Sequence, residues 1–109
     1  MVRKKGYKEA LIPIKWDARL RLRLFREKDK ALTGFTSQLE HYLGGKWRPV
    51  VRYDTAHGFF HRDFYSLSGK QKRKERNVIQ NLKEAVLFAD KDLRNNYKDY
   101  IEKFESDEL

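Results

Sequence analysis

Apolar and charged side chains alternate strictly along residues 18–25. Successive side chains of a β-strand point to opposite faces of its sheet, so this period of two predicts a strand that is buried on one face only. The two phases consist of Leu20, Leu22 and Leu24 on one side and Arg19, Arg21 and Arg23 on the other.

Three further segments are predicted to be strands, at 32–43, 47–54 and 59–66. Gly44-Gly45-Lys46 has the composition of a hairpin turn, and Ser68-Gly69-Lys70 predicts another turn. Pro49 lacks a backbone N–H, so we expect it at a strand start or at a bulge. Connections this short favour strands that pair in consecutive antiparallel order.

After Val78 the apolar residues are spaced by three or four. This spacing predicts an amphipathic helix over about 78–105, with Asn81 and Glu84 as a capping pair and Asn77 as a competing start. The apolar stripe of this helix consists of Leu82, Val86, Ala89, Leu93, Tyr97, Tyr100 and Phe104.

The predicted fold class is α+β: a four-stranded antiparallel meander over about 18–67, with one long C-terminal helix packed on one face. A sheet with one apolar face must be covered, and this helix is the available cover. Residues 1–13 are predicted to form a basic N-terminal arm, and residues 14–109 a single domain. The apolar sets expected under the helix are Leu20, Leu22 and Leu24; Phe35 and Leu39; Trp47, Val51 and Tyr53; and Phe60 and Phe64.

Two polar residues also fall in the phase of the covered face. His41 shares the phase of the apolar residues in the second strand and is predicted to lie at the edge of the core. Arg62 lies between two phenylalanines of the fourth strand. A buried arginine requires a carboxylate partner, and Asp90 and Asp92 of the helix are the candidates.

The charge of the chain favours polyanionic partners. Its 25 Lys and Arg residues against 16 Asp and Glu residues give a net charge of +9, which attracts nucleic acid first, RNA in preference to DNA, and an acidic protein second. No apolar run approaches the ~20 residues of a membrane span. Without cysteine there is no disulfide, thiol nucleophile or thiolate metal site. We therefore expect a cytoplasmic protein without membrane contact and without a cofactor, and its composition would suit a thermophile.

The uncovered face of the predicted sheet carries a row of arginines. Same-face residues of a strand are ~6.6–6.8 Å apart, close to the spacing of phosphates along an extended nucleic-acid strand, and tyrosines can stack on bases. Alternatively, these arginines form cross-strand pairs with acids such as Glu40, and the basic run 70–76 is a solvated loop. The candidate nucleic-acid-binding residues are Arg19, Arg21, Arg23, Arg48, Tyr65, Lys70, Lys72, Arg73 and Lys74.

Groups capable of proton transfer are concentrated in residues 52–63. The candidate catalytic residues there are His57, His61, Asp54, Asp63 and Arg52. The two imidazoles could act as general base and general acid in a metal-independent cleavage of RNA, with an arginine stabilising the phosphorane. The histidines and aspartates could instead ligate Zn, Mn or Fe, but the spacing matches no metal-binding fingerprint and nearby arginines oppose a cation, so no metal is expected. In a third interpretation these side chains only stabilise a turn.

The segment from Trp47 to Asp63 has the pattern W-x-P-V-V-R-Y-D-T-x-H-G-x-x-H-x-D. It resembles a family of small uncharacterised archaeal and bacterial proteins in which a C-terminal helix follows, and the resemblance covers most of the chain after residue 18. Arg52, Tyr53, Asp54 and His57 also resemble a pattern in the TumE-type toxins of toxin–antitoxin pairs. That second resemblance implies an RNA-directed toxin that is neutralised by a partner protein, an acidic antitoxin-like one.

Three functions are therefore open at this point. The first is a ribonuclease-like or toxin-like protein that acts on RNA through the His/Asp/Arg site. The second is a nucleic-acid-binding module without catalysis, and the third is a protein-interaction subunit whose basic face docks an acidic partner.

Overall fold

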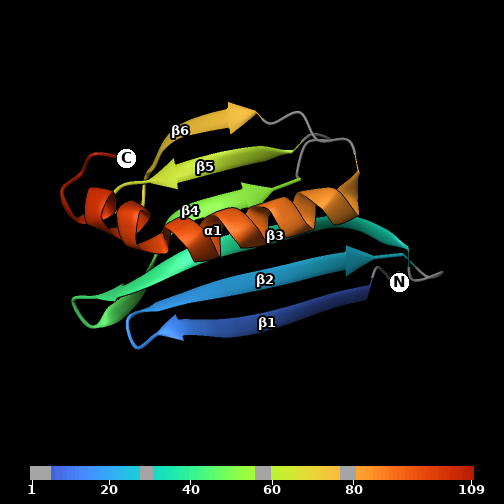
Figure 1. Ribbon diagram of the computed structural model, residues 1–109, viewed down its shortest axis with the longest axis horizontal. Coiled ribbons are helices and arrows are strands. Elements are labelled where there is room, and N and C mark those ends of the chain that lie inside the picture. The colour runs from blue at the N-terminus through green and yellow to red at the C-terminus, as the bar shows by residue number, and fades with distance from the viewer. Residues whose placement is uncertain (1–5, 28–30, 56–59, 77–80) are drawn as a thin grey trace.

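A computed structural model describes residues 6–27, 31–55, 60–76 and 81–109 of the chain. Its elements are six strands and one helix, and the strands form one antiparallel sheet in sequence order. The helix crosses one face of this sheet (Figure 1). The elements are β1 (Gly6–Lys15), β2 (Ala18–Arg26), β3 (Leu32–Leu43), β4 (Lys46–Asp54), β5 (His61–Tyr65), β6 (Gln71–Arg76) and α1 (Leu82–Glu105).

The α+β class, the antiparallel meander and the C-terminal helix on one face are confirmed, but the prediction of four strands is wrong. The two additional strands, β1 and β6, lie at the two edges of the sheet (Figure 1). β1 pairs with β2 along its whole length, so residues 6–13 are part of the sheet and not of a basic arm. Pro13 fits because an edge strand can lack one ladder donor.

The other additional strand, β6, lies in the basic run 70–76, for which a solvated loop was one of the two predictions. It pairs with β5 from Gln71 to Arg76, and every one of its residues except the half-buried Glu75 is exposed. A strand with no buried phase has no apolar alternation, so periodicity could not detect it. Lysine-rich edges are a common protection against pairing with a further strand.

A β-bulge lies in the middle of β4. The register places Val51 opposite Leu39 and Pro49 opposite Glu40, so Val50 is the extra residue. Val50 and Val51 are consequently both buried in the core, because a bulge sets two residues of one strand against one of its partner. The prediction that Pro49 marks a strand start or a bulge is confirmed.

The bulge reverses the predicted orientation of Trp47 and Arg48. Trp47 was expected under the helix, but its ring lies 5.3 Å from that of Tyr42 on the uncovered face. Arg48 was expected on the uncovered face, but it pairs in register with His41, which faces the helix. The phases N-terminal to the bulge are inverted because one extra residue shifts a period of two by half its length.

The core lies between α1 and the covered face of β2 to β5. Its fully buried members include Leu20, Phe35, Leu39, Tyr53 and Phe64 from the sheet. Ala85, Ala89, Leu93 and Phe104 of α1 pack against them. Each large side chain buried in this way contributes about 1.5–3 kcal/mol. Asn81 caps the helix by accepting a hydrogen bond from the backbone N–H of Glu84 at 3.1 Å, as predicted, whereas Asn77 lies outside the described residues.

A polar cluster fixes α1 to β4 and β5 inside this apolar contact. Asp92 Oδ2 accepts hydrogen bonds from the hydroxyls of Tyr53 at 2.7 Å and Tyr100 at 2.6 Å. Arg62 Nη1 lies 3.6 Å from the same oxygen, and Arg62 also pairs with Glu75 of β6. Of the two predicted carboxylate partners of Arg62, Asp92 is therefore confirmed. Burial and the Asp92 carboxylate raise the pKa of both tyrosines, so their hydroxyls remain donors.

Candidate functional site

The uncovered face of the sheet carries a layer of polar side chains that are nevertheless buried. These are Gln38, Glu40, His61 and Asp63. Buried polar groups need partners, and the partners of Glu40 come from three neighbouring side chains. Arg19 donates to Glu40 at 2.7 Å, Arg21 at 2.8 Å and Gln38 at 2.6 Å.

The arginine row of β2 is occupied by carboxylates. Besides Glu40, Glu9 of β1 binds Arg21 and Arg23, both at 2.7 Å. Burial alone would raise the pKa of Glu40, but the hydrogen bonds from Arg21, Arg19 and Gln38 outweigh it and lower that pKa below the usual range. The cross-strand ion pairs, which were the alternative to phosphate binding, are thus present. Part of this neutralisation depends on β1, which the sequence pattern did not predict.

Two other candidates for nucleic-acid contact are also engaged. Arg48 donates its Nε to the carbonyl of Leu43 at 2.9 Å and its Nη1 to that of Leu67 at 3.0 Å, so it holds two turns together. Tyr65 is buried, and the guanidinium carbon of Arg52 lies 5.4 Å above its ring. Neither side chain presents a free surface to a base or a phosphate.

The remaining candidates are exposed on and beside β6. Lys70 lies in the turn before this strand, and Lys72, Arg73 and Lys74 belong to it. Lys72 has an exposed ion pair with Asp107 at 3.2 Å. The guanidinium of Arg73 lies 4.1 Å above the ring of Phe64. Arg73 also has an ion pair with Glu75 at 3.5 Å. Surface ion pairs are worth only about 0–1 kcal/mol, so an incoming phosphate can replace them.

The candidate catalytic residues of β4 and β5 converge on the uncovered face. Asp54 pairs in register with His61, and Arg52 pairs with Asp63 on the same two strands. One donor atom from each of Asp54, His61 and Asp63 lies within 4.8 Å of the others. The period of two predicts this meeting, because residues 52, 54, 61 and 63 all lie on one face. His57, the fifth candidate, lies outside the described residues.

The environment of this cluster limits its chemistry. The side chains of His61 and Asp63 are 2% and 5% exposed, and His61 Nε2 lies 3.5 Å from Asp63 Oδ2. Asp63 Oδ1 is buried and accepts no hydrogen bond from the residues that the structure describes. Groups placed in this way can share a proton or hold a small cation, whereas direct contact with a large substrate would require the cluster to open.

Arg52 is connected to the arginine row by way of Gln38. Its Nε donates to Gln38 Oε1 at 2.9 Å, and the amide of Gln38 donates to Glu40. The hydrogen bonds therefore run from β4 through β3 to β2 across the uncovered face. This continuous network holds the polar layer in one arrangement.

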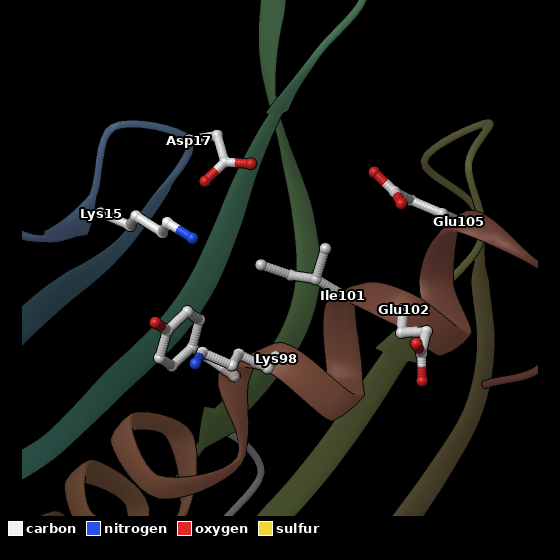
Figure 2. Close-up of a pocket in the computed structure, with 7 residues that line it drawn as sticks. Lys15, Asp17, Lys98, Ile101, Glu102 and Glu105 are labelled. Carbon is white, nitrogen blue, oxygen red and sulfur yellow. The ribbon is translucent and has the colours of Figure 1, made fainter.

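A small cavity opens between the β1–β2 turn and the C-terminal half of α1. Figure 2 shows Lys15 and Asp17 on one side of it and Ile101 and Glu105 of α1 on the other. Its volume of about 230 Å³ lies below the ~300–1,000 Å³ of typical ligand pockets. His41 is buried nearby, with Nδ1 2.9 Å from the carbonyl oxygen of Asp17 and Nε2 2.7 Å from Glu105. Its predicted place at the edge of the core is confirmed.

A larger hollow of about 640 Å³ lies near the N-terminal end of α1. The sequence predicted no site there. Of the described residues that line it, Arg26 and Lys83 are the charged ones, and they do not form a converging polar set that would orient a ligand. Its other lining residues are Leu24, Ala31, Leu32, Val86 and Leu87.

A family model described as a domain of unknown function, DUF7718, matches residues 3–108. The chain belongs to the DUF7718 family. No curated protein and no solved structure matches it. The one helix of the described residues, α1, is not apolar enough to cross a lipid bilayer.

Proposed function

We propose that this DUF7718 protein binds single-stranded nucleic acid, RNA in preference to DNA, along its basic edge. We define the basic edge as Lys70, Lys72, Arg73, Lys74 and Arg76. The observation that carries the proposal is that five cations within seven residues are exposed on the edge strand β6 and in the turn before it. The ion pairs of Lys72 and Arg73 lie at the surface, whereas the arginines of β2 are held by Glu9 and by the buried Glu40.

The distribution of charge supports this location. The helix holds five basic and six acidic residues, so the positive surplus of the chain belongs to the rest of the molecule. Attraction of the phosphate backbone is the dominant, sequence-independent part of nucleic-acid affinity. Same-face residues of β6 are spaced by ~6.6–6.8 Å, which suits an extended backbone.

Aromatic side chains beside the basic edge favour an unpaired strand. A hollow of about 110 Å³ joins Trp47 to Ser68 and Gly69, in the turn that precedes Lys70. The ring of Tyr42 packs against Trp47 and is 38% exposed. Stacking of bases on aromatic rings contributes about 1–3 kcal/mol per base in single-strand binding. RNA is preferred in the proposal because bases of single-stranded RNA are commonly bound on such sheet surfaces.

The test compares two triple variants that remove the same charge. Lys70→Gln/Lys72→Gln/Lys74→Gln alters the basic edge, and Lys83→Gln/Lys91→Gln/Lys98→Gln alters exposed lysines of α1. Fluorescence anisotropy with labelled single-stranded RNA is measured over a range of salt concentrations. We expect the basic-edge variant to reduce the slope of log affinity against log salt by about 0.7 per lost phosphate contact. The helix variant should keep the wild-type slope. Equal losses in both variants would contradict the proposal, and absence of wild-type binding would favour an acidic protein partner.

RNA cleavage is a second candidate, favoured by the convergence of Asp54, His61 and Asp63. An imidazole between two carboxylates can transfer protons, once the cluster opens to the substrate. The assay incubates labelled RNA with the wild type and with His61→Ala, each with and without EDTA. Cleavage that resists EDTA and disappears in His61→Ala would support an acid–base mechanism. Binding without cleavage would leave the protein as a binding module.

A further inference from the structure

We propose that Asp54, His61 and Asp63 form a binding site for one divalent transition-metal ion, of the class of Zn²⁺ or Mn²⁺. The residues lie on neighbouring strands: Asp54 is directly opposite His61, and Asp63 is two residues further along β5 on the same face. One donor atom from each lies within 4.8 Å of the other two. One imidazole and two carboxylates form a donor set that such ions bind.

The unpartnered oxygen of Asp63 is the independent observation that points to a ligand. Its side chain is almost completely buried, and among the described residues none donates a hydrogen bond to Oδ1. Leaving a buried carboxylate oxygen without a partner is costly. The other oxygen, Oδ2, faces the His61 imidazole at 3.5 Å. A cation bound at the cluster would compensate the buried charge.

Arg52 does not provide this compensation, although it is the cross-strand neighbour of Asp63. Its Nε donates to Gln38, and its guanidinium lies over the ring of Tyr65. Within the described part of the chain, no ion pair joins Arg52 to Asp63. The positive charge of Arg52 weakens the attraction of the site for a cation but leaves the Asp63 oxygen without a donor.

The geometry requires the donor atoms to move together. Bonds from Zn²⁺ to nitrogen or oxygen are ~2.1 Å and its ligands are arranged tetrahedrally, so two ligands of the ion lie about 3.4 Å apart. Donor atoms that are up to 4.8 Å apart must therefore approach by as much as about 1.4 Å, through rotation of the two carboxylate side chains. Asp54 is only half-buried, so solvent can reach the ion on that side and complete its coordination.

A proton is the competing occupant. If His61 is protonated, the imidazolium itself neutralises one carboxylate, and a metal ion would have to displace that proton. If the cluster binds a metal ion, added Zn²⁺ changes the NMR resonances of the His61 ring nitrogens, and if it holds only a proton, these resonances stay unchanged. Experiment can therefore separate the two states.

The first experiment titrates chelator-treated wild-type protein with Zn²⁺ and with Mn²⁺ by isothermal calorimetry, without nucleic acid. We expect one ion per chain. Asp54→Asn/Asp63→Asn should lower the affinity at least tenfold, whereas the matched control Asp90→Asn/Asp99→Asn removes two exposed charges from α1 and should leave it unchanged. No saturable binding to the wild type, or the same affinity in both variants, would overturn the proposal.

A second experiment covers the case in which the site variant does not fold. The ring nitrogens of the wild-type histidines are followed by long-range ¹H–¹⁵N NMR as Zn²⁺ is added. We expect the His61 resonances to shift with metal, while those of His41 stay in place, because both ring nitrogens of His41 already face Asp17 and Glu105. A His61 ring that remains unchanged at saturating Zn²⁺ would overturn the proposal. Neither experiment involves RNA, so its result is separate from that of the RNA-binding proposal.

Discussion

Replacement of Asp92 by alanine should destabilise the protein strongly. The carboxylate of Asp92 is 17% exposed and lies between α1 and the sheet. It accepts two short hydrogen bonds, from Tyr53 and Tyr100, and it lies near the Arg62 guanidinium. In Asp92→Ala both hydroxyls lose their acceptor, and Arg62 keeps Glu75 as its carboxylate partner.

The magnitude follows from these contacts. A hydrogen bond to a charged group contributes about 1.5–3 kcal/mol, and breaking a buried charge pair costs about 3–5 kcal/mol. Because Asp92 is partly exposed and its two bonds share one oxygen, we expect a loss of about 3 kcal/mol. At roughly 4–8 °C per kcal/mol for a domain of this size, the midpoint of thermal unfolding should fall by roughly 12–24 °C.

The control is Asp90→Ala on the same helix. Asp90 is 41% exposed and pairs with Arg94 one turn away, an interaction worth about 0.3–0.5 kcal/mol. Urea unfolding of both variants gives the two free energies of unfolding. If Asp92→Ala lies within about 0.5 kcal/mol of Asp90→Ala, the polar cluster does not anchor the helix and the reasoning is refuted.

Three further predictions concern the uncovered face and Thr55, the residue directly after β4. The pKa of Glu40 is lowered in the folded state, so its ionisation stabilises the protein above the ordinary carboxyl pKa of about 4.3, and this contribution is lost as the pH falls from there through the folded-state pKa. In urea unfolding between pH 7 and 3, the free energy of unfolding should therefore fall less for Glu40→Gln than for the wild type. An equal fall in both proteins would contradict this. Gly34→Ala should cost about 1–3 kcal/mol, because its new Cβ would lie 2.8 Å from Thr55 Oγ1. The double variant with Thr55→Ala should lose less than the sum of the two single variants, and strict additivity would show that the clash is absent. Tyr42→Ala should weaken binding of single-stranded RNA about 5- to 150-fold, whereas Trp16→Ala, which removes a 76% exposed ring from the β1–β2 turn, should not, and equal effects would point to nonspecific stacking.

Much of the fold could be predicted because most of the core obeys simple periods. Alternation located β2, and the spacing of three or four located α1, since each element buries one face. The same alternation predicted that Arg62 would need a helix carboxylate and that His61 and Asp63 would share a face with Asp54.

The errors have two physical causes. Edge strands need not alternate: β6 buries none of its residues fully, and the proline and lysines of β1 concealed the phase of Ile12 and Ile14, which pack on the core. The bulge at Val50 inverted the phase of the β4 residues before it, so Trp47 and Arg48 exchanged faces. Because β1 was not predicted, Glu9 was not expected to pair with Arg21 and Arg23, and the arginine row was interpreted as available for phosphates.

The proposal that RNA binds along the basic edge is tested most directly by mapping the contact on the protein. Amide ¹H–¹⁵N spectra are recorded while a short single-stranded RNA is added, and the shifted residues are placed on the structure. We predict that the shifts are concentrated at residues 68–76 and near Tyr42 and Trp47, and that α1 and the β1–β2 turn are unaffected. Shifts centred on Arg19, Arg21 and Arg23, or on α1, would contradict the account.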